Sequence, residues 1–176
     1  MTMTPGLRKF TLAVHLTSSV GWTGAVVAYI ALDVAAVTGQ DVQMVRAAFL
    51  AMELIVRYAI VPLALAALLT GLVMSLGSPW GLFRHYWVLI TLVLTILTTV
   101  VLLVETQTIG YMAEVAASGA DPRGLPGSLP HSVGGLVVLL VITVLNMYKP
   151  RGLTPYGWRK QQEESKQRAE RTAPGP

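Results

Sequence analysis

The chain has no cysteine, and this absence removes several kinds of chemistry. Disulfides, thiolate nucleophiles, iron–sulfur clusters and covalently attached haem of the c type all need cysteine sulfur. Charge is scarce as well, since Asp, Glu, Lys and Arg make up 12% of the residues, against about 25% in a soluble domain. Hydrophobic residues make up 53%, so an ordinary soluble domain is excluded.

What the chain does have is four long apolar stretches without Lys, Arg, Asp or Glu, at 10–32, 58–76, 87–104 and 132–148. A helix needs about 20 apolar residues to cross the ~30 Å hydrocarbon core of a bilayer. The strands of a membrane barrel would alternate polar and apolar residues, whereas these stretches are apolar all round. The sequence therefore predicts an all-α polytopic membrane protein, built as an antiparallel four-helix transmembrane bundle.

We divide the chain into two parts. Residues 1–150 are predicted to form the transmembrane domain, with spans at about 10–37, 54–76, 87–105 and 131–148. Apolar periodicity begins near Val42, so the second helix should start outside the membrane, and Pro62 is expected to kink it. Residues 151–176 form a basic and polar tail that we expect to be cytoplasmic and partly disordered.

Basic residues are divided unevenly between the two sides of such a bundle. Four crossings place both termini and the loop at 77–86 on one side. Ten of the 13 Lys and Arg residues fall there: Arg8, Lys9, Arg84, Lys149, Arg151, Arg159, Lys160, Lys166, Arg168 and Arg171. The other side holds Arg46, Arg57 and Arg123. The positive-inside rule therefore predicts cytoplasmic termini, and we expect the chain in a plasma (inner) membrane.

His15 is a polar group at membrane depth, where it is costly unless it has a partner. Neutral imidazole is a common ligand, so one interpretation is a haem or metal ligand, or a proton relay. The other interpretation is a histidine that Ser or Thr satisfies across the bundle. His85 precedes the third span on the same side. It either helps to bracket a haem or lies at the headgroups beside Arg84.

Two segments carry a family resemblance: HLTSSVGWTG at 15–24, with the form H-x6-W-x-G, and GLFRHYWVLIT at 81–91. Over roughly 10–104 the chain resembles small bacterial four-helix membrane proteins of unknown function. These are distantly similar to the copper-resistance D proteins and to the membrane-bound protoporphyrinogen oxidase of the HemJ type. The first-helix histidine of that oxidase is a proposed haem ligand. The oxidase also has a lysine on its third helix, near where this chain has Thr91.

The resemblance implies haem b, or a redox-linked role, at His15. Trp22, His85, Thr91 and Thr95 would then surround the porphyrin. The alternative, from a different class, is a non-catalytic membrane subunit or a carrier of a small solute or ion. We identify no set of catalytic residues in the sequence.

A second group of polar residues lies at the opposite ends of the spans. Glu53, Glu105 and His131 combine carboxylates with imidazole, which suits a divalent cation or a proton path. The alternative is a ring of solvated interfacial charges. Glu53 and Arg57 have the i,i+4 spacing of an ion pair.

The expected partner is the lipid bilayer, together with a second copy of the chain or a membrane partner subunit. Nucleic acid is not expected, because the basic residues flank the spans and show no stripe with interleaved aromatics.

Topology reporters fused at Gly119 and at Pro174 test the charge argument. We expect the Gly119 fusion to report the outer side and the Pro174 fusion to report the cytoplasm, because the basic residues flank the tail side. The measurement is a paired alkaline phosphatase and green fluorescent protein assay. The reverse pattern would contradict the predicted orientation.

Overall fold

The computed structural model describes residues 3–77, 81–150 and 152–172. Its helices are α1 (Pro5–Thr38), α2 (Val42–Ile55), η1 (Val56–Ile60), α3 (Val61–Gly77), α4 (Tyr86–Ala117), η2 (Pro122–Gly124), α5 (Leu129–Tyr148) and α6 (Pro155–Thr172). Within the described residues, the β-type pairing is one isolated bridge between His85 and Leu153. The all-α prediction is therefore confirmed. Residues 1–2, 78–80, 151 and 173–176, which include the end of the predicted tail, lie outside the described residues.

Four helical stretches are long and apolar enough to cross a membrane: Pro5–Thr38, Val42–Gly77, Tyr86–Ala117 and Leu129–Tyr148. The first three contain 34, 36 and 32 residues. At 1.5 Å per residue each is ~50 Å long, more than the ~30 Å of a hydrocarbon core. The fourth contains 20 residues, close to the minimum. The protein is therefore a membrane protein by helix length and composition, and three of its four candidate spans extend beyond a bilayer core.

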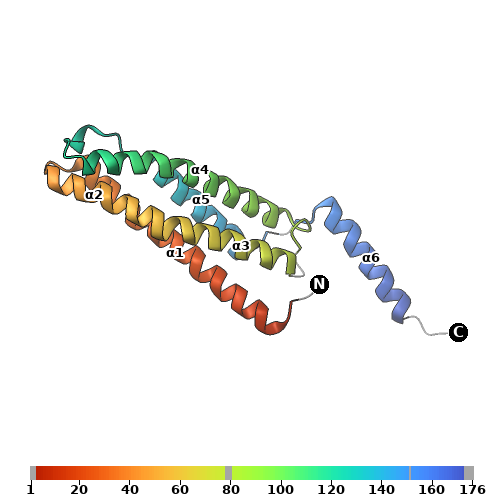
Figure 1. The fold of residues 1–176 in the computed structure, drawn as a ribbon. Helices are drawn as coiled ribbons and strands as arrows, with labels where there is room; N and C mark the ends of the chain where they lie inside the picture. The colour runs from red at the N-terminus through yellow and green to blue at the C-terminus, as the bar shows by residue number, and fades with distance from the viewer. Residues whose placement is uncertain (1–2, 78–80, 151, 173–176) are drawn as a thin grey trace.

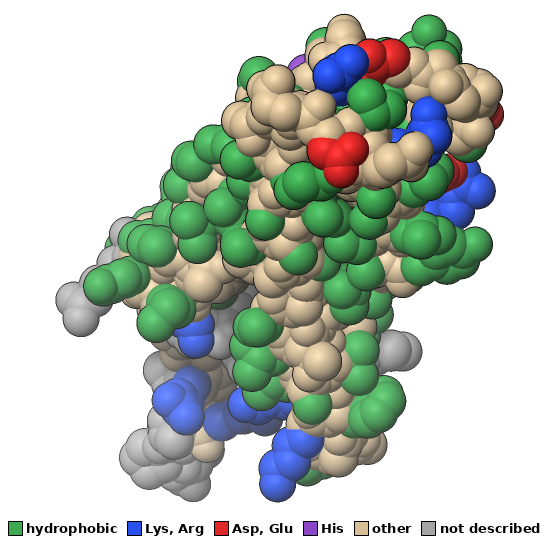
Figure 2. Space-filling model, turned by 90° about the vertical axis from the view of Figure 1, so that its left-hand side faces the viewer, with side chains coloured by type: hydrophobic (Ala, Val, Ile, Leu, Met, Phe, Trp, Pro, Cys, Tyr) green, Lys and Arg blue, Asp and Glu red, His purple; other side chains and the backbone are tan. Residues whose placement is uncertain are grey.

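The spans form an antiparallel bundle (Figure 1). α1 packs against α2, α3 and α5, and α4 packs against the same three helices. α1 begins at the end where α5 stops and α6 starts, which we call the α6 end. The α1–α2 turn and η2 lie at the opposite end, which we call the η2 end. On the face shown in Figure 2, acidic side chains gather towards the η2 end, and Lys and Arg lie at both ends.

The second span departs from α-helical geometry next to Pro62. Residues Val56–Ile60 form η1, a π-helical turn between α2 and α3. Proline lacks an N–H, and its ring clashes with the carbonyl four residues earlier, which here belongs to Tyr58. A wider turn relieves this clash without breaking the helix. The structure thus has a π turn ending two residues before Pro62, where the sequence predicts a kink.

The tightest packing lies at the η2 end. Val45 and Met52 of α2 have no exposed surface, and Phe49 between them is 2% exposed. Their spacing of four and three residues puts all three on one face of the helix. Ile109 and Met112 of α4 join the same buried cluster. This end of the bundle has the core of a soluble helical domain, in keeping with helices that continue past a bilayer core.

Small residues bring the helices together towards the α6 end. A Cβ at Gly21 would lie 3.3 Å from Leu63, so the missing side chain lets α1 and α3 approach closely. α5 buries less than its neighbours, since Leu139 is its one buried residue. Its remaining apolar residues are partly or largely exposed, as expected of a helix that faces lipid.

The start of α6 is joined to the α3–α4 connection. Thr154 donates its backbone N–H to the carbonyl of Arg84 and its hydroxyl to the carbonyl of Phe83. A Cβ at position 157 would lie 2.3 Å from the Arg84 carbonyl oxygen, so Gly157 permits this approach. Arg84 also forms a 2.7 Å ion pair with Glu164, and this contact lowers the pKa of Glu164. The predicted tail is therefore helical from Pro155 to Thr172, and the first turn of this helix is held against the bundle.

Candidate functional site

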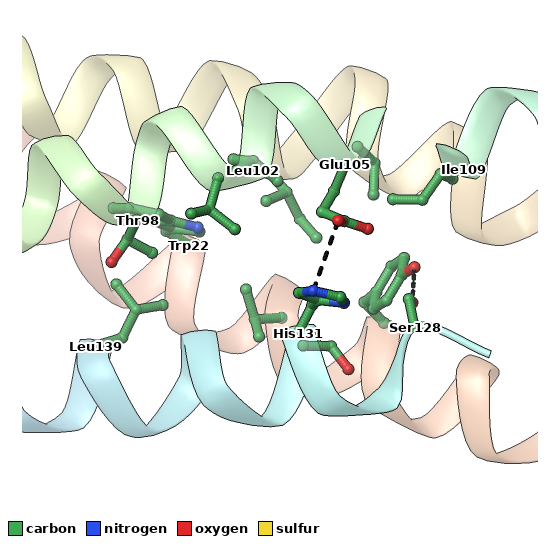
Figure 3. Close-up of a pocket in the computed structure, with 14 residues that line it drawn as sticks. Trp22, Thr98, Leu102, Glu105, Ile109, Ser128, His131 and Leu139 are labelled. Carbon is green, nitrogen blue, oxygen red and sulfur yellow. Dashed lines mark hydrogen bonds and ion pairs between the residues drawn. The ribbon is translucent and has the colours of Figure 1, made fainter. Parts of the chain in front are cut away.

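A cavity of about 80 Å³ lies between α1, α4 and α5 (Figure 3). Its polar lining comes from three helices and from the residue before α5: Tyr29 of α1, Thr98 and Glu105 of α4, Ser128, and His131 and Ser132 of α5. Val56 and Ile60 of the π turn form part of its apolar wall. A space of this size admits several water molecules or a small solute.

One face of α1 supplies the aromatic wall of the cavity. Trp22, Val26 and Tyr29 line it at intervals of four and three residues, so they lie above one another on the helix. Both aromatic side chains are only 3% exposed. The same face continues one turn further to Asp33, which is fully buried.

Asp33 and Ser128 form the most buried polar contact of the site. The Ser128 hydroxyl donates to Asp33 Oδ2 over 2.8 Å, and the Ser128 N–H donates to Asp33 Oδ1 over 3.3 Å. The Tyr29 hydroxyl lies 2.5 Å from Ser128 Oγ. Because the single hydroxyl proton of Ser128 goes to Asp33, Tyr29 must donate the third bond. The lone pairs of the Tyr29 oxygen are then left as acceptors.

Gly127 makes this contact sterically feasible. A Cβ at position 127 would lie 2.4 Å from a methyl group of Val37 and 2.9 Å from Asp33 Oδ1. Any larger residue would force the side chains of Val37 and Asp33, or the connection itself, to shift. The connection into α5 therefore needs glycine for its close approach to α1.

Glu105 and His131 face each other across the cavity from α4 and α5 (Figure 3). His131 Nε2 lies 3.8 Å from Glu105 Oε1, which is too long for a hydrogen bond. The Glu105 side chain is 20% exposed and that of His131 60% exposed. An acidic and a basic group thus meet without a hydrogen bond at the edge of a largely apolar cavity.

His15, the predicted haem ligand, lies between α1 and α3. Its Nδ1 is 3.1 Å from both the Ala67 carbonyl oxygen and Thr70 Oγ1. Thr70 donates its own proton within α3, to the carbonyl of Ala66. Both neighbours are therefore acceptors, and Nδ1 carries the ring proton. The ring also lies against Gly71, where an added Cβ would be 3.1 Å from Cε1.

The other predicted haem-binding residues are spread along the bundle. Trp22 lines the cavity between α1, α4 and α5, whereas Thr91 and Thr95 do not. The Thr91 hydroxyl donates to the Val88 carbonyl, and that of Thr95 to the Thr91 carbonyl, so both bond within α4. His85 precedes α4 and bridges to Leu153 at the α6 end. Of this set, Trp22 is therefore the residue that lines the cavity between α1, α4 and α5.

The predicted metal site is brought together in part. Glu105 and His131 meet, whereas Glu53 forms a 2.9 Å ion pair with Arg57. Among residues 3–77, 81–150 and 152–172, no three His, Asp or Glu side chains are grouped closely enough to hold a metal ion. Glu53 and Arg57 border a separate groove with Glu114 on the far side of α4.

Tyr29, Asp33 and Ser128 were not selected as site residues from the sequence. The spacing of Trp22, Tyr29 and Asp33 on one helix face was the available signal for two of these residues. Ser128 is 95 residues from Asp33, in a connection rich in Gly and Pro, and no local pattern points to it.

Comparison of the chain with known protein families, with curated proteins and with solved structures finds no match. The function is therefore inferred from the site itself.

A double-mutant cycle tests the contact between α1 and the start of α5. Asp33→Ala and Ser128→Ala should each destabilise the protein, because each leaves a buried polar group without its partner. We expect a coupling free energy of about 1–3 kcal/mol. It is measured by reversible unfolding in mixed micelles of dodecyl maltoside and dodecyl sulfate. Asp33→Ala combined with Ser165→Ala, on exposed α6, is the additive control, and additivity in the first pair would contradict the contact.

Proposed function

We propose that this protein is a membrane carrier for a small solute or ion, with the cavity between α1, α4 and α5 as its binding site. The observation that carries the proposal is the meeting of Glu105 and His131 in a cavity lined mainly by apolar residues. Ionisable groups of a membrane protein that line a cavity rather than face lipid usually serve transported species or protons. Apolar pockets with a few convergent polar groups are typical of small-molecule sites.

The π turn supports a carrier over a static subunit. Val56 and Ile60, the first and last residues of η1, both line the cavity. A π turn has one residue more than the α-helical register needs, and such turns are frequent at functional sites. A shift of this turn along the second span would move the cavity wall without breaking the helix. The cavity can then change shape while α1, α4 and α5 stay packed.

The proposed setting is the plasma membrane of a bacterium, with both termini in the cytoplasm. The basic residues at the α6 end support this orientation. The cavity would then lie near the outer surface, with Asp33 and Ser128 closing the bundle beyond it.

Filling the cavity tests the carrier proposal. A panel of sodium, ammonium, methylammonium, acetate, glycine and isopropanol is screened by the thermal unfolding temperature of the protein in detergent. We expect at least one solute to raise this temperature in the wild type and not in Ser132→Phe, because the added ring fills the site. Val133→Phe, at the neighbouring exposed position, is the matched control and should respond as the wild type does.

A panel that stabilises neither the wild type nor the control would contradict the carrier proposal. If Ser132→Phe and the wild type respond equally, the solute binds outside this cavity.

A haem-b protein is the second candidate, and the hydrogen bonding of His15 favours it. Nδ1 donates to the Ala67 carbonyl and to Thr70, so the lone pair of the ring lies on Nε2. A backbone carbonyl that fixes one ring nitrogen in this way is typical of histidines that bind a metal through the other. The same two bonds would also satisfy a histidine with only a structural role, which is the role that His15 has in the carrier proposal.

An absorption spectrum decides between these two roles of His15. Protein expressed with added haem precursor is purified in detergent and measured before and after dithionite. A haem protein would show a Soret band that shifts on reduction, is lost in His15→Ala and is retained in His131→Ala. A flat wild-type spectrum would contradict the haem candidate.

A further inference from the structure

We infer that the cavity between α1, α4 and α5 selects a small organic cation, an ammonium group with compact alkyl substituents, over neutral or anionic solutes of the same shape. This inference rests on the proposed function, since it names the solute class for the same site. Three features of the cavity carry it: the balance of charge, the direction of its hydrogen bonds, and its aromatic wall.

The charge around the cavity is negative. Its lining contains the Glu105 carboxylate and no Lys or Arg. A second carboxylate, that of Asp33, lies directly behind Ser128 with no exposed surface. The nearest arginine along the second span, Arg57, is paired with Glu53 and borders the other groove. The His131 side chain is 60% exposed, so its ring can turn towards solvent. The Glu105 carboxylate is then available to pair with a bound cation.

The hydrogen bonds among the residues that line the cavity also favour a cation. Ser128 donates its hydroxyl proton to Asp33, and Tyr29 donates its hydroxyl proton to Ser128. The Ser132 hydroxyl donates to the carbonyl of Leu129 in its own helix. Glu105 receives no hydrogen bond from His131 at 3.8 Å. Tyr29, Ser132 and Glu105 therefore offer acceptor oxygens to a ligand, while the Trp22 N–H and the Thr98 hydroxyl remain as neutral donors. With one carboxylate and no Lys or Arg in the lining, this set suits a positive charge better than an anion.

The aromatic wall completes the argument. Trp22 and Tyr29 line the cavity from one face of α1, and both are almost fully removed from solvent. Aromatic rings attract cations through their quadrupole, most strongly where water is excluded, and quaternary ammonium ligands are typically held by such rings. A cavity of about 80 Å³ restricts the ligand to a group of a few non-hydrogen atoms.

Three probes that carry methyl groups on one tetrahedral centre and differ in charge test the inference: tetramethylammonium, tert-butanol of the same size, and the larger anion pivalate. Binding to the full-length protein in lipid nanodiscs is measured by saturation-transfer NMR, which detects millimolar affinities. We expect tetramethylammonium to bind about tenfold more tightly than tert-butanol, and pivalate to bind more weakly than either. Equal or tighter binding of tert-butanol or pivalate would overturn the cation inference and leave the carrier proposal standing.

Removing the charge of Glu105 gives the site-specific test. Glu105→Gln should weaken tetramethylammonium binding about tenfold and change tert-butanol binding by less than twofold. Glu114→Gln removes the same charge from the same helix at an exposed position outside the cavity. It should leave the affinities for tetramethylammonium and for tert-butanol unchanged. An equal effect of the two substitutions would show a general electrostatic effect and would overturn the inference.

A second variant keeps the test decisive if Glu105→Gln does not fold. Trp22→Leu keeps an apolar side chain and removes the aromatic ring, so it should weaken tetramethylammonium binding and spare tert-butanol. Tetramethylammonium binding that survives in both Trp22→Leu and Ser132→Phe would place the cation elsewhere and overturn the inference. If none of the three probes binds the wild type, and acetate, glycine or isopropanol raises its unfolding temperature in the thermal panel, the cation class alone is overturned.

Discussion

The Asp33 carboxylate has no exposed surface, and Ser128 satisfies it through both its N–H and its hydroxyl. A buried carboxylate without partners would cost several kcal/mol, so this contact holds the connection into α5 against α1. α5 itself buries only Leu139, and its apolar packing alone defines its position weakly. Ser128 therefore determines where α5 starts, and His131 follows one turn later to face Glu105. The cavity exists because this one contact closes the bundle at the η2 end.

The two ends of the bundle are stabilised differently. At the η2 end, Val45, Phe49 and Met52 form a core in which removal of apolar surface from water drives packing. Towards the α6 end, small residues such as Gly21 and Gly71 allow close helix contacts, as lipid provides no hydrophobic drive between helices. The cavity lies between these two differently packed parts of the bundle, next to the π turn. A binding site there has a rigid support on one side and more adaptable helices on the other.

Much of the fold was predictable from the sequence, and the site was predictable only in part. The uncharged stretches, Pro62 and the i,i+4 spacing of Glu53 and Arg57 are local patterns, and the structure has helices, a π turn and a 2.9 Å contact at these places. The sequence places Glu105 and His131 at span ends on the same side, and the structure brings them to 3.8 Å. Glu53 was grouped with them on the same reasoning, yet it lies on another face of the bundle.

The sequence by itself determined that the protein is helical and has four candidate spans, because uninterrupted apolar stretches in lipid must satisfy their backbone bonds within each helix. Only the tertiary structure decided which polar groups meet. The rotation of each helix about its axis brings Thr70 to His15, and a glycine in the connection brings Ser128 to Asp33. Helix rotation and close approach depend on how side chains from distant segments pack together. No local pattern along the chain encodes them, so the cavity and its acceptor oxygens emerge only when the bundle is assembled.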